Sequence, residues 1–177
     1  MAADAGEPGS ILVEEAGIVA NEALPGGHYL LRLAAPGVAA RARPGQFLHL
    51  RCGPELPLRR PLSILRASTR DGAVEVLYKA VGAGTRLLAT RRAGETLSVI
   101  GPIGRPFEPD ATRPRVLAIG GGVGMPPMLF LAQALRGTAF SPLLLLGSEV
   151  AFPFQPKPST LMLEGMPAGV IAALPLA

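Results

Sequence analysis

The sequence has no tryptophan and only one cysteine, Cys52. A single cysteine excludes an internal disulfide and any metal cluster held by several thiolates of this chain. No apolar run reaches the roughly 20 residues that a membrane-spanning helix needs, because prolines interrupt the longest candidates. Residues 1–10 are polar and acidic and lack the apolar core of a signal peptide. These absences predict a cytoplasmic protein with no membrane partner.

Lysine is also scarce, and charge of either sign is thinly spread. Lys79 and Lys157 are the only lysines, and the arginines are scattered along the chain. Because a nucleic-acid surface needs clustered cations, no nucleic-acid partner is expected. The 177 residues are 49% hydrophobic and 17% charged. This composition is sufficient for a buried core and argues against extensive disorder.

The most informative stretch reads RVLAIGGGVGMPPMLFLAQALR, residues 115–136. Its apolar start predicts a buried strand over residues 116–119, and the glycines that follow predict a tight turn. The pair Pro126-Pro127 suits the first turn of a helix. One face of that helix is predicted to carry Met128, Leu131, Ala132 and Leu135. A second buried strand over residues 143–146 then predicts a parallel α/β sheet.

The turn in this stretch contains Gly120, Gly121, Gly122 and Gly124, with Val123 between the last two. Glycines let the backbone approach a ligand closely, and N–H groups at a helix start attract an anion. A nucleotide phosphate is therefore the predicted ligand. The alternative is a tight turn that binds nothing, because Met125 stands where the dinucleotide fingerprint has its third glycine.

The part of the chain before this stretch predicts a small antiparallel barrel. Alternating patterns predict strands over residues 11–20, 29–33, 46–52, 73–80 and 96–100. Thr85 is the predicted N-cap of a short helix that includes Leu87 and Leu88, with Arg91-Arg92 at its C-terminal end, and Gly94 is predicted to stop it.

Neither histidine is assigned a chemical role. His28 and His49 lack a second ligand at a useful spacing, so they are interpreted as packing or surface residues. Cys52 is interpreted as a small apolar strand residue, with a reactive thiol as the alternative. No metal site is predicted. The predicted organisation is a flexible leader over residues 1–10, a barrel domain over 11–108, a linker over 109–114 and an incomplete α/β domain over 115–177.

This order of elements, and the residues at its joints, resemble the ferredoxin–NADP reductase superfamily. The motifs that carry the resemblance are Arg60-Pro61-Leu62-Ser63, Leu77-Tyr78-Lys79, Gly84-Thr85, Gly101-Pro102-Ile103-Gly104 and Gly120-Gly121-Gly122-Val123-Gly124. Within it, RRPLSI followed by LYKAVGAGT resembles the electron-transfer subunits of dihydroorotate dehydrogenase. Reductase subunits of sulfide-dehydrogenase or hydrogenase type share these parts and are the alternative. The implied fold is a β-barrel plus α/β: an antiparallel FAD-binding barrel followed by the first part of a parallel nucleotide-binding sheet.

The resemblance also implies cofactors and the residues that bind them. Arg60 would bind the FAD pyrophosphate through bidentate hydrogen bonds, and Gly84-Thr85 would offer backbone N–H groups. Leu62 would pack where many relatives have tyrosine, and Ser63 with residues 77–79 would border the flavin ring. The glycine turn would bind NAD(H). No catalytic side chain is named, because the cofactors would carry electrons between the nicotinamide nucleotide and a partner catalytic dehydrogenase subunit, in pyrimidine biosynthesis.

Departures from the family lead to a further expectation. Such subunits carry four cysteines for a two-iron two-sulfur cluster near the C-terminus, and this chain has none there. Proline-rich residues 151–160 replace an expected helix, and the chain stops at Ala177 in an apolar, helix-like start. The chain is therefore interpreted as a truncated family member that alone retains flavin binding at best. The alternative is a flavin- or partner-binding module without turnover.

Glu149, which follows the second predicted strand of the α/β part, predicts a preference for NADH over NADPH. A carboxylate accepts hydrogen bonds from a ribose 2′-OH and repels a 2′-phosphate. The alternative interpretation is a solvated surface glutamate.

Overall fold

The computed structural model describes residues 11–150, Lys157–Pro158 and Ala172–Ala173. The predicted leader over residues 1–10 lies outside the described residues, as do most of the proline-rich segment 151–160 and of the apolar segment 168–177. Within the described part, β9 (Lys157–Pro158) and β10 (Ala172–Ala173) pair with each other as a small antiparallel ladder. No helix in this part of the chain has the length and apolar character to cross a membrane.

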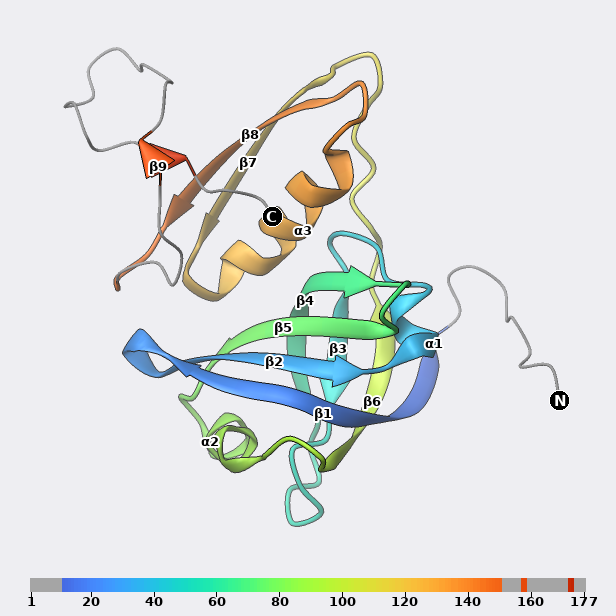
Figure 1. The fold of residues 1–177 in the computed structure, drawn as a ribbon, viewed down its shortest axis with the longest axis vertical. Helices are drawn as coiled ribbons and strands as arrows, with labels where there is room; N and C mark the ends of the chain where they lie inside the picture. Colours follow the sequence, from blue (N-terminus) through green and yellow to red (C-terminus); the bar gives the residue numbers. More distant parts are fainter. Residues whose placement is uncertain (1–10, 151–156, 159–171, 174–177) are drawn as a thin grey trace, which may run out of the picture.

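Six antiparallel strands close into a barrel, which confirms the predicted barrel (Figure 1). Around the barrel the order is β1-β2-β5-β4-β3-β6. Their bounds are Leu12–Leu24 for β1, His28–Ala34 for β2, Phe47–Leu50 for β3, Arg60–Ser68 for β4, Ala73–Lys79 for β5 and Thr96–Ile103 for β6. Strand β1 closes the ring because its first half pairs with β6 and its second half with β2.

Alternation along the strands decides which side chains fill the barrel. In β3, Leu48 and Leu50 are fully buried, while Phe47 and His49 on the other side are half-buried. In β5, Val74, Val76 and Tyr78 are buried within the same core. Successive strand residues point to opposite faces, so this pattern places every second residue inside the barrel.

The short helix after β5 begins earlier than its sequence pattern predicts. Helix α2 spans Ala83–Thr90, and its N-cap is Gly82 instead of Thr85. Thr85 lies in the first turn, where its Oγ1 accepts hydrogen bonds from the N–H groups of Val81 and Gly82, both at 3.1 Å. The prediction of Thr85 as N-cap is therefore wrong, because its hydroxyl reaches back to the preceding turn. The helix also ends before Arg91 and well before Gly94.

The second unit is a parallel strand–helix–strand arrangement. Strand β7 (Arg115–Gly121) runs parallel to β8 (Ser141–Gly147), in register from Arg115 opposite Ser141 to Gly121 opposite Gly147. Between them lie a 3₁₀ turn, η2 (Gly122–Gly124), and helix α3 (Met125–Leu135). This arrangement confirms the predicted strand, glycine turn, helix and second strand.

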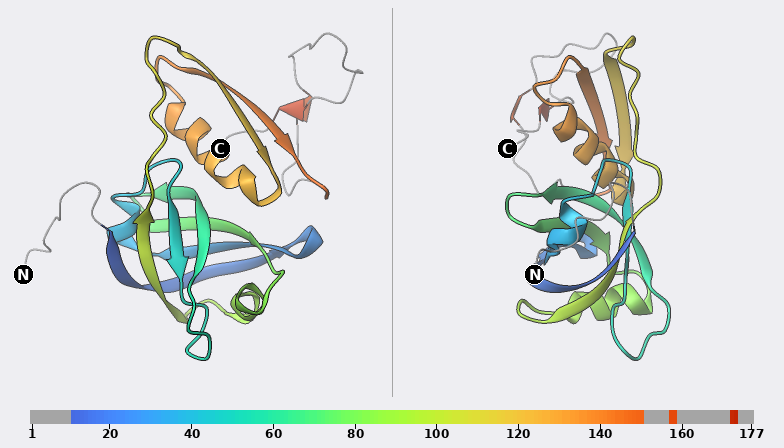
Figure 2. Two further views of the ribbon diagram at one scale, coloured as in Figure 1. Left: turned by 180° about the vertical axis from the view of Figure 1, so that it is seen from behind. Right: turned by 90° about the vertical axis from the view of Figure 1, so that its right-hand side faces the viewer.

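Helix α3 lies between the β7–β8 sheet and the barrel (Figures 1 and 2). The sequence pattern predicted a single apolar face that includes Met128. In the structure Met128 is only half-buried, whereas Met125, Leu129 and Phe130 are buried. Phe130 packs with the barrel core, and Met125 and Leu129 pack with Leu77 of β5. The other three residues of the predicted face are buried, which confirms the prediction for them. The prediction was incomplete, because the helix is covered on a second side as well.

The face of the β7–β8 sheet that points away from α3 is apolar and exposed. Leu117 and Ile119 of β7 are 58% and 66% exposed, and Leu143 and Leu145 of β8 are each 37% exposed. The alternate residues Ala118, Leu144 and Leu146 are buried or half-buried on the α3 side. We call these four exposed side chains the outer apolar face.

Candidate functional site

Two of the predicted cofactor motifs meet where β4 begins and α2 begins. A Cβ placed on Gly84 would lie 3.0 Å from both Cγ and Cζ of Arg60 and would collide with Nε of the same side chain. The Arg60 side chain therefore passes directly over Gly84, and only a glycine leaves room for it. Arg60 Nη1 donates to the main-chain carbonyl of Leu58 at 3.0 Å. No carboxylate of the described residues forms an ion pair with Arg60.

The first turn of α2 adds backbone donors beside this guanidinium. The N–H groups of the first helical residues have no acceptor within the helix. In α2 these residues are Ala83, Gly84 and Thr85. A guanidinium next to free N–H groups at a helix start makes a site for a phosphate or pyrophosphate. The Arg60 side chain, held against Gly84 beside these N–H groups, is thus the observation that fits an FAD pyrophosphate to these residues.

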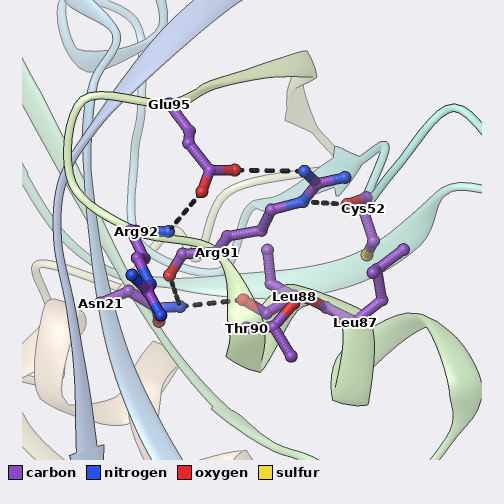
Figure 3. A network of polar contacts seen from close by, with 8 residues as sticks. All are labelled: Asn21, Cys52, Leu87, Leu88, Thr90, Arg91, Arg92 and Glu95. Carbon is purple, nitrogen blue, oxygen red and sulfur yellow. Dashed lines mark hydrogen bonds and ion pairs between the residues drawn. The ribbon is translucent and has the colours of Figure 1, made fainter.

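The other end of α2 is fixed by Asn21 of β1 (Figure 3). Asn21 Nδ2 donates to the carbonyls of Leu88 at 2.9 Å and Arg91 at 3.0 Å. Its Oδ1 accepts a hydrogen bond from the Tyr78 hydroxyl at 3.1 Å. Asn21 thus connects the C-terminal end of the helix to the barrel interior. The sequence did not predict a role for Asn21. The one local indication is a side-chain amide in a mostly apolar stretch, and its hydrogen-bond partners are far away in the sequence.

A second set of contacts holds the turn after α2. Arg91 Nε donates to the Cys52 carbonyl at 3.0 Å, and Arg91 Nη1 pairs with Glu95 Oε2 at 3.1 Å (Figure 3). The Cys52 side chain is fully buried. Burial raises the pKa of its thiol, while Arg60 and Arg91 act in the opposite direction. A buried thiol with a raised pKa is a poor nucleophile, in agreement with its interpretation as an apolar residue.

Within the motif on β4, the residues after Arg60 face different surroundings. Leu62 lies opposite Leu48 and packs, half-buried, against the barrel core. Ser63 is half-buried opposite Phe47, and Pro61 is exposed. Directly opposed residues of an antiparallel pair share a face, so Leu62 belongs to the core side of β4.

The motif on β5 is divided between two faces of the strand. Tyr78 is 1% exposed, and its ring stacks on Tyr29 with centroids 5.4 Å apart. Burial raises the pKa of its hydroxyl well above the ordinary value. Because this side chain points into the barrel, contact between Tyr78 and a cofactor is left to its backbone. Leu77 is buried under α3, and Lys79 lies in the wall of a hollow.

The hollow has a volume of about 540 Å³ and lies between the barrel and the α/β unit. The barrel contributes His28 and Lys79, and the α/β unit contributes Gly121, Gly122, Val123, Gly147, Ser148 and Glu149. Both glycine-containing segments follow the carboxyl ends of β7 and β8, which is where open α/β sheets bind nucleotides. Lys79 Nζ and Glu149 Oε2 are 3.6 Å apart and connect the two walls.

The five residues of the glycine turn have different roles. A Cβ on Gly120 would lie 3.0 Å from the Gly124 carbonyl oxygen and 3.1 Å from Met125 Cα, so Gly120 lets the helix start close to the strand. Gly122 has a φ of +52°, a conformation that favours glycine. Gly121, Gly122 and Val123 line the hollow, whereas Gly120 and Gly124 are not among its lining residues.

The start of α3 offers fewer donors than its sequence suggested. Pro126 and Pro127 lie in the first turn and have no N–H group, and the Met125 N–H already donates to the Gly122 carbonyl. A phosphate in the hollow would therefore depend on the N–H groups of the preceding turn. The helix start itself is a weak anion site, because its two prolines have no N–H group to donate.

His28 lines the hollow, although its sequence context predicts a packing or surface residue because no second ligand stands at a useful spacing. The structure brings it to the hollow through the pairing of β2 with β5, in which His28 lies opposite Lys79. Among the described residues, no group of three His, Cys, Asp or Glu side chains could hold a metal ion.

Comparisons with known proteins agree with this geometry. No protein-family model matches the chain. The electron transfer subunit of dihydroorotate dehydrogenase B (NAD(+)) from Desulforamulus reducens is 38% identical over 109 residues, which are 60% of this chain and 42% of that protein. The subunit of the same name from Enterococcus faecalis is 36% identical over 141 residues, 76% of this chain and 54% of that protein. The chain spans about half the length of the curated relatives that it matches.

Solved structures give the same result. The NADH-dependent reduced ferredoxin-NADP oxidoreductase, studied for flavin-based electron bifurcation, is 29% identical with a TM-score of 0.71, over 78% of this chain and 50% of that one. The ferredoxin reductase of carbazole 1,9a-dioxygenase is 31% identical with a TM-score of 0.68, over 84% and 47%. The predicted resemblance is thereby confirmed: the chain has the ferredoxin reductase-like fold of the ferredoxin–NADP reductase superfamily, and its sequence resembles the electron-transfer subunits of dihydroorotate dehydrogenase.

Proposed function

We propose that this chain is a flavoprotein electron-transfer subunit that binds FAD on its barrel and a nicotinamide nucleotide in the hollow beside it. The observation that carries the proposal is the Arg60 guanidinium lying over Gly84 at the start of α2. One of the similar structures is the FAD apo form of the ferredoxin reductase in carbazole 1,9a-dioxygenase, which supports FAD as the flavin. Residues 11–108 would form the flavin-binding domain and residues 115–177 part of the nucleotide-binding domain, joined by the linker 109–114.

On the flavin side, Arg60 would donate two parallel hydrogen bonds to the pyrophosphate. The backbone N–H groups of Gly84 and Thr85 would donate to the same phosphates. Ser63, half-buried on β4, has a hydroxyl that can hydrogen-bond to the edge of a flat ring. When bound by these residues, the flavin would supply the chemistry for accepting a hydride from a nicotinamide nucleotide and passing single electrons to a partner subunit.

On the nicotinamide side, the turn of Gly121, Gly122 and Val123 would hold the phosphates through its backbone. Glu149 also lines the hollow, in the segment after β8. Its carboxylate would accept hydrogen bonds from a ribose 2′-OH and repel a 2′-phosphate, so NADH would be preferred. Lys79, 3.6 Å from that carboxylate, keeps it from being an isolated charge.

The partner would be a catalytic dehydrogenase subunit, as the name of the curated relatives suggests, and we propose pyrimidine biosynthesis as the pathway. A two-iron two-sulfur cluster does not fit the residues of this chain. Such a cluster needs four ligands, usually cysteine thiolates, and the chain has one cysteine, which is buried. No step is therefore assigned to a cluster on this chain, and cytoplasmic location remains a prediction.

Flavin titration tests the proposal. FAD binding to the purified chain, followed by fluorescence quenching, should weaken by about 2–3 kcal/mol in the Arg60→Ala variant, the scale of a charged hydrogen bond. Arg59→Ala is the matched control, because Arg59 is held on the barrel by Ser98, at 2.7 Å from its carbonyl. Unchanged FAD affinity in Arg60→Ala would refute the assignment. A flavin that binds but is not bleached by NADH would favour the alternative, a flavin-binding module without turnover.

A further inference from the structure

The imidazole of His28 lies in the wall of the hollow with one nitrogen already used. His28 is 9% exposed, and its Nδ1 is 3.1 Å from the Pro25 carbonyl oxygen. A carbonyl oxygen can only accept, so Nδ1 carries the hydrogen of that bond. In the neutral ring, Nε2 is then a hydrogen-bond acceptor.

That second nitrogen has no partner in the described part of the chain. The one hydrogen bond of the His28 side chain there is the bond to Pro25. Nε2 is not buried away from solvent, so it is in contact with open space. His28 lines the large hollow and also a smaller one of about 20 Å³ beside Leu77 and Met125. An acceptor that is open to solvent beside a hollow can exchange water for a donor group of a bound ligand.

The turn before His28 holds the ring in place. A Cβ on Gly26 would lie 3.3 Å from His28 Nδ1 and 2.7 Å from Cγ1 of Val150, the residue after Glu149. Pro25, Gly26 and Val150 thus lie close to the imidazole. The ring is buried and hydrogen-bonded at Nδ1.

We propose that His28 is a positioning residue for the nicotinamide half of the nucleotide, accepting a hydrogen bond at Nε2 from its carboxamide N–H or ribose O–H. The assignment rests on the proposed function. The phosphates belong at the glycine turn of the α/β unit, and hydride transfer requires the nicotinamide to face the barrel, where the flavin lies. His28 and Lys79 are the barrel residues in the wall of the hollow. Because Lys79 has only donors, His28 supplies the acceptor.

The two histidines of the chain make a direct test possible. The FAD-loaded full chain gives two imidazole Cε1–H signals by NMR, which His28→Asn and His49→Asn assign. Addition of NAD⁺ or nicotinamide mononucleotide should shift the His28 signal and leave that of His49, which lies on β3, unchanged. AMP, which lacks the nicotinamide, should shift neither. A His28 signal that responds to AMP but not to nicotinamide mononucleotide would overturn the proposal.

Affinity measurements with two matched variants separate this role from a structural one. In His28→Asn the amide can still donate to Pro25 but does not reach the hollow, so the Kd for NAD⁺ should rise about three- to tenfold, the effect of one neutral hydrogen bond. His28→Gln places a carbonyl oxygen near the Nε2 position and should restore part of the affinity. The Kd for FAD should be unchanged in both, which also shows that the variants fold.

The outcomes distinguish the two levels of the proposal. If the wild-type chain binds FAD but neither NAD⁺ nor nicotinamide mononucleotide, the nicotinamide part of the proposed function fails, and the role of His28 fails with it. If NAD⁺ binds equally well to wild type and His28→Asn, only the role of His28 is refuted. A shift of the His28 signal on FAD addition alone, with none on NAD⁺, would assign the ring to the flavin and overturn the proposal.

Discussion

Gly84→Ala is the most informative single substitution, because it should weaken flavin binding without lowering the stability of the protein. The new Cβ would lie 3.0 Å from Arg60 Cγ and Cζ and would collide with Nε, so the guanidinium must move away from the start of α2. Displacing the bidentate partner of the pyrophosphate should cost about 1.5–3 kcal/mol of FAD binding, a roughly 10- to 150-fold rise in Kd.

Stability should not fall with it. The atoms that must move belong to a flexible side chain, not to the backbone. Gly84 has no positive φ, and alanine in a helix is favoured over glycine by up to about 1 kcal/mol. Urea unfolding of the flavin-free protein should therefore show an unchanged or slightly raised free energy of unfolding. FAD titration of the same preparation supplies the second measurement.

Gly82→Ala is the matched control in the same turn. A Cβ there would have no heavy atom within 4 Å, and the φ of Gly82 is −118°. Its FAD affinity should be close to that of the wild type. Equal loss in Gly82→Ala and Gly84→Ala, or no loss in either, would show that the space under Arg60 is not part of the flavin site.

Three further predictions concern pH, nucleotide choice and surface. Burial raises the Tyr78 pKa in the folded state above its ordinary value of 10.0, so the folded state holds this proton more tightly. The free energy of unfolding should therefore fall as pH rises above about 10, by up to about 1.4 kcal/mol per pH unit, with a shallower fall in Tyr78→Phe. Identical alkaline unfolding profiles would contradict this. Glu149→Gln removes a carboxylate that is 90% exposed and paired with Lys79. The ratio of NADPH affinity to NADH affinity should therefore rise about three- to tenfold at low salt. An unchanged ratio would identify Glu149 as a solvated surface residue. Leu117→Gln with Ile119→Gln should lower the fluorescence of the hydrophobic dye ANS bound to the 177-residue chain, since both side chains lie on the outer apolar face. Ile11→Gln is the control, because Ile11 is also exposed but precedes β1, outside that face. Equal effects would refute a contiguous patch.

The local elements of this protein follow from its sequence because their signals are local. Period-two alternation in residues 47–50 and 73–79 places Leu48, Leu50, Val74 and Val76 in the barrel core, as the structure shows. The apolar run, glycines and proline pair between residues 116 and 127 determine a strand, a turn and a helix through backbone conformation alone. The order of these elements was sufficient to predict a barrel followed by a parallel α/β unit.

Tertiary structure alone decided which of the predicted site residues come together. Three placements depend on closure of the barrel. Arg60 lies against Gly84, Tyr78 is buried inside the barrel, and His28 lies in the wall of the hollow. Thr85 was misassigned as an N-cap because its hydroxyl binds a turn whose shape the sequence pattern does not specify. The second apolar side of α3 was missed because a helical periodicity cannot tell how many neighbours a helix will have. Contacts such as that of Asn21 with Leu88, 67 residues away, join parts of the chain that share no local pattern, so only the folded barrel determines them.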